Sequence, residues 1–278
     1  MTEDIRKGVA GTAFVVNHSR TKLPEVSQDI YAHLWVNQES VEMWDRFASQ
    51  VYPNDDANLC SRTRFFLENL RDFISKNPDP AFVDLASGFD NYPFLVESAC
   101  RFLEFDCEGT MAYKRCMVDQ WMTEGKLPIR KVEYHPTDLN DPFQRGKMQR
   151  ILAETIGNRP SMVTMQGVTY YLEKEALDDI FRLLAAVQQK DSLLLFDYWR
   201  PDALEYDTMM RFKKFLEEDL GCAEQKWNLF DRSYIRTIPG YEEIESTEIA
   251  ELERRYSTTR RLQQREKIPG FYSVLRRT

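Results

Sequence analysis

Short apolar runs alternate with amphipathic segments along the chain from residue 81 onward. The runs predict buried strands at 81–86, 103–108, 132–136, 161–167 and 193–199. The segment "KEALDDIFRLLAAVQ" places apolar side chains at i, i+3, i+4 and i+7, as in a helix with one buried face, through Leu177, Ile180, Phe181 and Leu184. This alternation is typical of a mostly parallel sheet covered by helices on both faces.

The segment from about Gln28 to Lys76 has a helical pattern instead. Its clearest part is "SRTRFFLENLRDFI", in which five apolar side chains recur at helical spacing: Phe65, Phe66, Leu70, Phe73 and Ile74. No repeat or low-complexity linker divides the chain. We therefore predict one domain over residues 1–278, with a helical cap region at 1–78 and an α/β core at 79–278.

Composition narrows the function classes. The chain has 278 residues and a formal net charge of -8, which argues against nucleic-acid binding because that function needs a dominant basic surface. Its five cysteines are odd in number and lack a CxxC pair, which disfavours a disulfide framework or a zinc cluster and favours a cytoplasmic location. The apolar runs are too short to predict a signal peptide or a membrane span.

The stretch "AFVDLASGFDNYPF" carries the first sign of a ligand site. We predict a strand ending at Ala86, a tight turn through Gly88 and then a helix containing "FLVESACRFL". A dinucleotide-binding turn has the pattern G-x-G-x-x-G, but Ala86, Gly88 and Asn91 occupy those places here. With one glycine of three, NAD is a poor candidate.

A carboxylate follows at the end of the next predicted strand. Asp106 stands 22 residues after Asp84, where an acid can accept the hydrogen bonds of a ribose diol. A ligand with a ribose but no phosphate satisfies both observations. S-adenosylmethionine is such a ligand.

Six blocks in order resemble the leucine carboxyl methyltransferase family of S-adenosylmethionine-dependent O-methyltransferases. They are "GTAFVVNHSR", "SRTRFF", "VDLASGFDNYPF", "LEFDCEGTMAYKR", "HPTDLND" and "PSMVTMQGVTYYLEKEALDDIF". Further on, "GYEEIESTEIAELERRY" and "GFYSVLRR" resemble the family's last two strands and the helix between them. The resemblance implies a Rossmann-like class I methyltransferase with a mostly parallel seven-stranded sheet and a helical N-terminal cap.

The resemblance also implies roles for particular residues. Asp106 would hold the ribose of S-adenosyl-L-methionine, and the adenine would lie beside Asp138 and Leu139. Arg20 and Arg64 would face the methionine carboxylate or the substrate. The methionine end of the pocket would be shaped by Asp84, Gly88 and Asp90.

Three positions depart from the family's usual pattern. Ala86 replaces the first glycine of the loop, so the backbone there is expected to adopt angles that ordinary residues tolerate. Ser87 replaces the alanine that follows. Gln166 stands where a glutamate is usual, which removes a carboxylate partner for the cofactor's ammonium group.

Two pairs of neighbouring residues each allow two interpretations. Arg62 and Arg64 are two apart on a predicted helix, about 200° around its axis, so only one can face the pocket. The resemblance favours Arg64. Tyr170 and Tyr171 follow the fourth strand, where the substrate would meet the methyl group, so each is either a substrate contact or part of the core.

The sequence contains no pattern for metal-assisted or covalent catalysis. Its three histidines form no H-E-x-x-H spacing, and no G-x-S-x-G elbow occurs. We therefore expect direct methyl transfer from a sulfonium to oxygen, in which the protein aligns the reactants and excludes water. A carboxylate acceptor needs no base because its pKa is about 4. A hydroxyl acceptor, a non-catalytic binding module and an NAD-dependent oxidoreductase are the alternatives.

The expected acceptor is a small molecule or an organic acid bound to a carrier protein. Residues 251–278 carry eight Lys and Arg against three Glu, although the whole chain is acidic. This tail is either a solvated helix face or a docking patch for an acidic partner such as a carrier protein.

Overall fold

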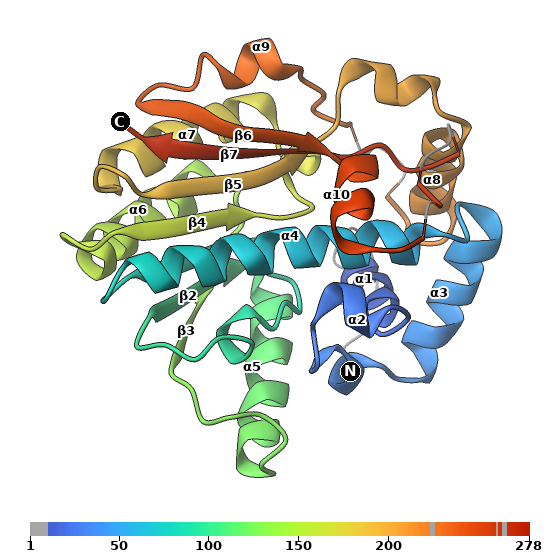
Figure 1. Ribbon diagram of the computed structural model, residues 1–278, viewed down its shortest axis with the longest axis horizontal. Coiled ribbons are helices and arrows are strands. Elements are labelled where there is room, and N and C mark those ends of the chain that lie inside the picture. The colour runs from blue at the N-terminus through green and yellow to red at the C-terminus, as the bar shows by residue number, and fades with distance from the viewer. Residues whose placement is uncertain (1–10, 223–225, 260, 263–265) are drawn as a thin grey trace.

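A computed structural model describes residues 11–222, 226–259, 261–262 and 266–278 of the chain. Within these ranges one sheet has the strand order β3-β2-β1-β4-β5-β7-β6, and β7 runs antiparallel to both of its neighbours (Figure 1). The strands are β1 (Ala81–Leu85), β2 (Arg101–Asp106), β3 (Val132–Pro136), β4 (Ser161–Met165), β5 (Leu193–Tyr198), β6 (Tyr241–Glu248) and β7 (Phe271–Arg277). The predicted seven-stranded, mostly parallel sheet is confirmed.

Helices precede, connect and follow the strands. Among the described residues, four α-helices precede β1: α1 (Thr12–Arg20), α2 (Pro24–Ser27), α3 (Gln38–Gln50) and α4 (Asp55–Lys76). Three connect parallel strands: α5 (Glu108–Thr123), α6 (Pro142–Ile156) and α7 (Lys174–Val187). Those after β5 are α8 (Asp207–Glu218), α9 (Arg232–Ile235) and α10 (Ile249–Tyr256).

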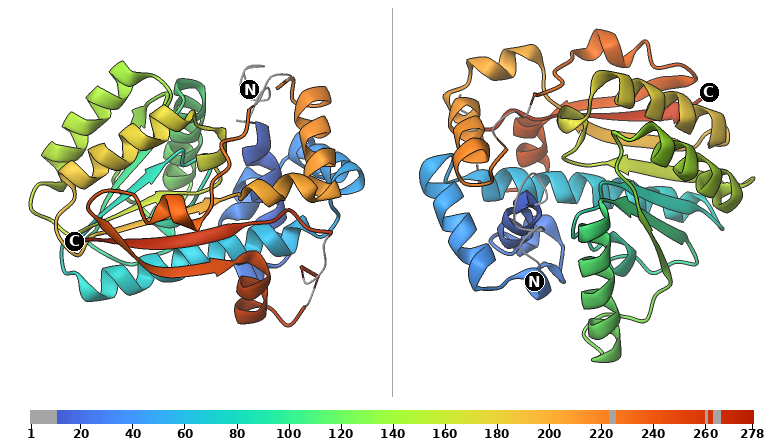
Figure 2. Two further views of the ribbon diagram at one scale, coloured as in Figure 1. Left: turned by 90° about the horizontal axis from the view of Figure 1, so that it is seen from above. Right: turned by 180° about the vertical axis from the view of Figure 1, so that it is seen from behind.

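The sheet has a helical layer on each face. In Figure 1, α4 runs across one face beside α10, and Figure 2 shows α6 and α7 on the opposite face. Phe65 and Phe66 of α4 are fully buried against Phe82, Met162 and Tyr272 of the sheet. On the other face, the apolar stripe of α7 packs against the sheet as predicted, with Leu177, Ile180, Phe181 and Leu184 at most 1% exposed.

The connection between β1 and β2 differs from the prediction. The expected helix over "FLVESACRFL" does not form; a short 3-10 turn, η4 (Tyr92–Phe94), is followed by β2 from Arg101. Few residues remain for a helix between these elements. The face of the sheet beside them is covered by α4, whose Phe66 shares a core cluster with Phe82 and Phe102. The helix that precedes the sheet in sequence therefore takes the place of the missing crossover helix.

The N-terminal helices lie at the carboxyl ends of the parallel strands. There α1 packs against α3 and α4, and α3 also contacts α8 (Figure 1). An aromatic cluster joins Phe14 of α1 to Trp35, Phe89 and Trp121, with the rings of Trp35 and Phe89 stacked 4.5 Å apart. Within the described ranges, no helix has the length and apolar character needed to cross a bilayer.

Candidate active site

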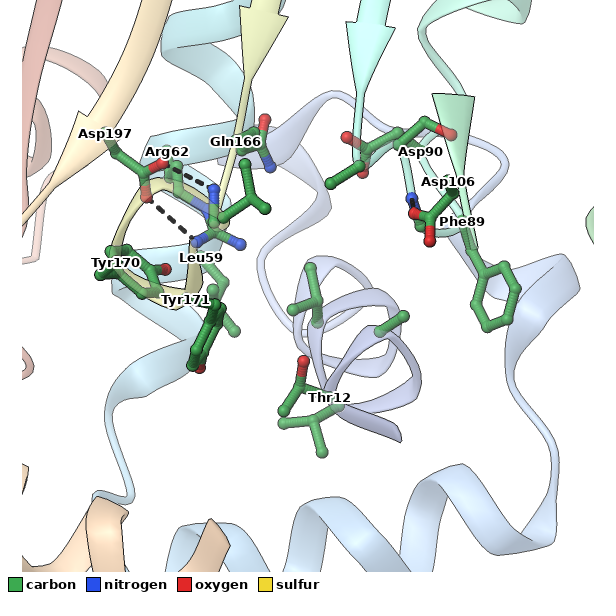
Figure 3. A pocket seen from close by; sticks show the side chains of 18 of the residues that line it. Thr12, Leu59, Arg62, Phe89, Asp90, Asp106, Gln166, Tyr170, Tyr171 and Asp197 are labelled. Carbon is green, nitrogen blue, oxygen red and sulfur yellow. Dashed lines mark hydrogen bonds and ion pairs between the residues drawn. The ribbon is translucent and has the colours of Figure 1, made fainter. Parts of the chain in front are cut away.

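A cavity of about 330 Å³ lies between the carboxyl ends of β1, β2, β4 and β5 and the helices α1, α3, α4 and α8. This is where ligands bind in open α/β sheets. In Figure 3, Phe89, Asp90 and Asp106 lie on one side of α1, and Arg62 and Tyr171 lie on the other. The cavity thus has two ends: the Asp106 end, and the Arg62 end beyond Gln166.

Asp106 closes the loop after β1. Its Oδ2 accepts a hydrogen bond from the backbone N–H of Gly88 at 2.7 Å, and its Oδ1 accepts one from the N–H of Cys107 at 2.7 Å. Burial raises the pKa of Asp106, although these two N–H groups oppose the shift. Gly88 has a φ of +45°, a backbone region that favours glycine. Both residues line the cavity, as expected.

Ala86 corrects one expectation about this loop. Its φ is +60°, in the left-handed region, so the backbone keeps the conformation that a glycine would adopt there. Ala86 N–H donates to the carbonyl of Phe105 at 2.8 Å, which fixes the turn against β2. The alanine is therefore strained by on the order of 1 kcal/mol instead of relaxing the loop.

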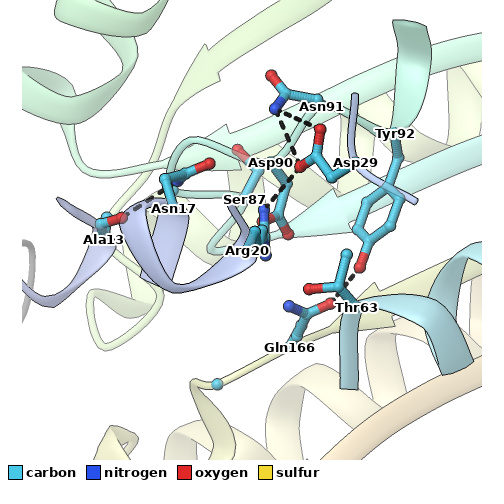
Figure 4. A network of polar contacts seen from close by, with 12 residues as sticks. Ala13, Asn17, Arg20, Asp29, Thr63, Ser87, Asp90, Asn91, Tyr92 and Gln166 are labelled. Carbon is cyan, nitrogen blue, oxygen red and sulfur yellow. Dashed lines mark hydrogen bonds and ion pairs between the residues drawn. The ribbon is translucent and has the colours of Figure 1, made fainter. Parts of the chain in front are cut away.

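A buried ion cluster supports the loop from the side of α1 (Figure 4). Arg20 is 1% exposed; one of its Nη groups donates to Asp90, and the other lies 3.5 Å from Asp29. Asn91 Nδ2 donates to both oxygens of Asp29 at 3.0 Å. Of this cluster Arg20 and Asp90 line the cavity, and these two side chains pair with each other in the cavity wall.

Gln166 lies at the end of β4, between the two ends of the cavity. Its Oε1 accepts a hydrogen bond from the hydroxyl of Tyr92, and the side chain is 7% exposed (Figure 4). The replacement of a carboxylate by this amide therefore leaves a neutral, oriented side chain in the cavity wall.

Asp84 lies behind the cavity wall, contrary to its predicted place. It is fully buried, and its Oδ1 accepts a hydrogen bond from Thr164 Oγ1 at 2.8 Å. Next to it, Glu104 and Lys114 form a fully buried ion pair at 2.5 Å, and Lys114 also donates to Ser87 Oγ at 3.4 Å. Because these side chains are inside the core, Asp84 can act on a ligand only through the loop.

The structure also corrects the choice between the two arginines. Arg64 pairs with Glu68 at 2.7 Å one turn along α4, and it lies outside the cavity lining. Arg62 lines the cavity, and its Nη1 lies 3.4 Å from Asp197 Oδ2 (Figure 3). Burial alone would lower the pKa of Arg62, but Asp197 raises it above its ordinary value. Arg62 is therefore a buried cation at the cavity.

Asp197 and Gly167 hold Arg62 in place. Asp197 Oδ1 accepts the N–H of Gly167 at 2.6 Å, and a Cβ at Gly167 would meet Arg62 Nη1 at 3.1 Å. Sequence reasoning missed Asp197 as a site residue. Asp197 is the penultimate residue of β5, close to the strand end that Asp106 occupies in β2, so a search for acids near the strand ends could have found it.

Asp138 and Leu139 follow β3 and line the Asp106 end of the cavity, as expected. Leu139 is 5% exposed and offers an apolar surface. Asp138 is exposed; its Oδ1 accepts the N–H of Asn140 at 2.9 Å, and its own N–H donates to Gln144. Together they form a short turn whose geometry is held by its own polar groups.

Tyr170 and Tyr171 belong to η5 (Thr169–Tyr171) and line the Arg62 end. Tyr170 stacks on Trp199 with ring centroids 3.6 Å apart, and Tyr171 meets Tyr170 edge-on at 4.8 Å. Tyr170 thus combines core packing with a place in the cavity wall. Burial raises the pKa of both phenols, so both are neutral.

The basic tail is largely neutralised by neighbouring acids. Four of its arginines pair with carboxylates at 2.5 to 3.1 Å: Arg254 with Glu251, Arg255 with Glu245, Arg261 with Asp56 and Arg276 with Glu242. Three of these carboxylates, Glu245, Asp56 and Glu242, lie outside the tail, so part of its excess charge is compensated by neighbouring elements, which favours the solvated-face interpretation.

The sheet order, with an antiparallel β7 between β5 and β6, defines an α/β fold shared with known methyltransferases. A proposed methyltransferase from Thermobifida fusca YX superimposes with a TM-score of 0.68 at 12% identity, covering 98% of this chain and 95% of that one. A DUF574 family protein from Streptomyces avermitilis MA-4680 gives 0.67 at 13%, covering 99% of each chain. Magnesium protoporphyrin IX methyltransferase from Synechocystis PCC 6803, solved with bound SAH, gives 0.51 at 13%, covering 87% and 96%.

The chain belongs to the leucine carboxyl methyltransferase family, whose sequence model matches residues 9–185. The predicted family and fold class are thereby confirmed. The search for curated relatives found no match. The protein is a methyltransferase, and its cofactor is the S-adenosylmethionine expected from the sequence.

Proposed function

We propose that this protein transfers a methyl group from S-adenosylmethionine to a carboxylate oxygen of a small or carrier-bound organic acid. The observation that carries the proposal is Arg62, a buried guanidinium in the cavity wall. Only Asp197 forms an ion pair with Arg62 in the described part of the chain, and the Nε of Arg62 is buried without a hydrogen-bond partner. A ligand carboxylate in the cavity would give this guanidinium a second anionic partner.

The Asp106 end of the cavity fits the cofactor. Each oxygen of Asp106 accepts one backbone N–H and can accept a second hydrogen bond, so the carboxylate can bind a ribose diol. Leu139 and Asp138 would flank the adenine, and Asp90 and Gln166 would face the methionine end. When bound there, the cofactor supplies an electrophilic methyl group on a cationic sulfur.

The Arg62 end fits an anionic acceptor that reacts without a general base. An acceptor carboxylate is ionised at neutral pH and is already a nucleophile. Tyr170, Tyr171 and Trp199 form an aromatic wall that excludes water from the reacting groups. Because the negative acceptor and the positive sulfur neutralise each other as the bond forms, a dry cavity favours the reaction.

A hydroxyl acceptor is the second candidate, and Asp55 favours it. Asp55 lines the Arg62 end, and burial raises its pKa to about 6, which suits a general base. With such a base, the rate at saturating acceptor falls as the pH drops below about 6. With a carboxylate acceptor, the rate stays nearly flat between about pH 5.5 and 9.

The chemistry of the product separates the two candidates. We would incubate the protein with methyl-labelled S-adenosylmethionine and a panel of organic acids, each paired with the alcohol or phenol of the same skeleton. Mild alkali releases labelled methanol from methyl esters and leaves methyl ethers intact. Ester formation, together with a flat pH profile, supports the proposal. If the acids stay unlabelled and the hydroxyl compounds give stable ethers, the carboxylate assignment is wrong.

A further inference from the structure

We propose that the Arg62 end of the cavity selects organic acids with a flat apolar body and a hydrogen-bond donor at the end remote from the carboxylate, and that Asp55 and Asn58 bind this donor. The inference rests on the proposed function and adds the class of acceptor to it. Three features carry it: the spacing of polar groups on α4, the state of Asp55 and the aromatic walls.

One face of α4 presents two opposite charges to the cavity. Asp55, Asn58, Leu59 and Arg62 occupy positions i, i+3, i+4 and i+7, so they lie on the same side of the helix, and all four line the cavity. Seven residues of helix span about 10 Å. The backbone positions that carry the carboxylate and the guanidinium are thus held about 10 Å apart along one wall by a single helix.

Asp55 is a buried acceptor with little compensation. It is 3% exposed, and Asn58 Nδ2 donates to its Oδ1 at 2.8 Å. Its neighbour Asp56 pairs with Arg261 at 3.1 Å, whereas no ion pair involves Asp55 in the ranges that the structure describes. Burial raises the pKa of Asp55 to about 6, so the side chain is still largely ionised at neutral pH. A donor on the ligand would satisfy this carboxylate.

The Arg62 end of this face of α4 is suited to an anion. Arg62 is 8% exposed, and its Nε is buried without a hydrogen-bond partner. A ligand that extends along α4 from Arg62 to Asp55 would therefore place its carboxylate near Arg62, beside the end of β4, and its donor near Asp55. In the reverse orientation the ligand carboxylate would meet the carboxylate of Asp55, and the donor would face Arg62, which accepts no hydrogen bond.

Aromatic side chains form the walls between these two points. The aromatic residues lining the cavity include Phe47 of α3, Tyr170 and Tyr171 of η5, Trp199 after β5, and Phe212 and Phe215 of α8. Tyr170 and Trp199 are stacked with their planes 4° apart, and Phe47 meets Phe215 edge-on at 5.4 Å. Such walls favour a flat body, because rings pack against one another through faces and edges.

The test compares two acids that differ by one hydroxyl group, 4-(4-hydroxyphenyl)butyrate and 4-phenylbutyrate. Their affinities are measured by titration calorimetry on the full chain saturated with S-adenosylhomocysteine. The wild type should bind the hydroxyl compound at least tenfold more tightly, because a site built around a polar contact rejects the analogue that lacks it. Equal affinities, or no binding of either acid, would overturn the inference.

Three variants locate the contact. Asp55→Asn should reduce the preference to about threefold or less, and Asp55→Leu should abolish or reverse it, since a neutral or apolar side chain is a weaker or absent acceptor. Asp56→Asn is the matched control: it changes the adjacent carboxylate, which lies outside the cavity lining, and should keep the full preference. A preference that survives in both Asp55 variants, or is lost equally in Asp56→Asn, contradicts the assignment.

Product analysis separates this inference from the proposed function. If the two acids bind equally while methyl esters form, the acceptor subsite is wrong and the function stands. If the preference depends on Asp55 but no acid of the panel is esterified, the subsite stands and the carboxylate function fails. A methyl ether formed on the phenol, and lost in Asp55→Asn, would make Asp55 a base and overturn its role as the distal anchor.

Discussion

Replacing Asp55 by asparagine should stabilise the folded protein at pH 8, even though it removes a charged side chain from a candidate active site. Asp55 is 3% exposed, and the side-chain amide of Asn58 donates to it at 2.8 Å. Asparagine has nearly the same shape and can accept the same hydrogen bond. The substitution therefore removes the buried charge and leaves the packing in place.

The magnitude follows from the pKa of Asp55, which burial raises from 3.8 to about 6. Each pKa unit corresponds to about 1.36 kcal/mol, so a difference of 6 - 3.8 ≈ 2.2 units gives about 3 kcal/mol. Because the pKa of Asp55 is higher in the folded than in the unfolded protein, protonation of Asp55 favours folding. Its contribution of about 3 kcal/mol to the stability is fully present below about pH 3.8 and is lost as the pH rises through about 6. We expect a gain of about 1 to 3 kcal/mol for Asp55→Asn at pH 8, and little gain near pH 4.

The assay is urea unfolding of wild type, Asp55→Asn and Asp56→Asn, followed by fluorescence at about pH 4.5 and pH 8. Asp56 pairs with Arg261 and accepts the N–H of Ala57 at 2.9 Å, so its substitution should be neutral or destabilising at both pH values. The reasoning is refuted if Asp55→Asn is no more stable than wild type at pH 8, or if its gain is the same at both pH values.

Three further predictions concern the Asp106 end of the cavity and the core beneath it. Asp106→Ala should weaken S-adenosylmethionine binding by about 2 to 4 kcal/mol in a calorimetric titration, because the ribose hydroxyls would lose a charged acceptor in a buried site. Ala86→Gly should raise the free energy of unfolding by a few tenths to about 1 kcal/mol, since glycine adopts the φ of +60° without strain; a loss of stability would show that the alanine is not strained. Glu104→Gln should destabilise the fold by about 3 to 5 kcal/mol, opposite in sign to Asp55→Asn, because Lys114 would keep a buried charge without its partner at 2.5 Å; equal stability in urea would contradict this.

The sheet could be predicted from the sequence because the central strands β1, β4 and β5 are short, largely apolar runs with polar residues at or close to their carboxyl ends. Asp106 at the end of β2 is such a residue, and the same rule places Asp138 and Gln166 at the cavity. Parallel strands bring their carboxyl ends to one edge, so residues distant in sequence converge there. Asp84 and Asp197 each lie one residue before the end of their strand, but only Asp197 lines the cavity; the side chain of Asp84 enters the core, where Thr164 donates to it.

Hydrophobic periodicity alone could not predict whether Arg62 or Arg64 faces the cavity. The first half of α4 packs against the sheet, α1 and α2, and another side of it lines the cavity. It therefore has no solvent-facing stripe of polar residues from which its orientation could be predicted. A polar signal was present in the sequence: Asp55, Asn58 and Arg62 recur at i, i+3 and i+7, on one face of the helix. Arg64 falls on the side where Glu68 and the ring of Tyr256 lie.

The same helix also explains why stability and acceptor recognition are joined in this chain. Because no helix forms between β1 and β2, α4 alone supplies Phe65 and Phe66 to that face of the sheet, and both are at most 1% exposed. Arg62 is one turn earlier on this helix, so a shift that moved its guanidinium would also unpack those rings. Fully burying an aromatic side chain is worth about 1.5 to 3 kcal/mol, so such a shift is costly. The distance from Arg62 to Asp55 is therefore fixed by the core, and an acceptor must match it.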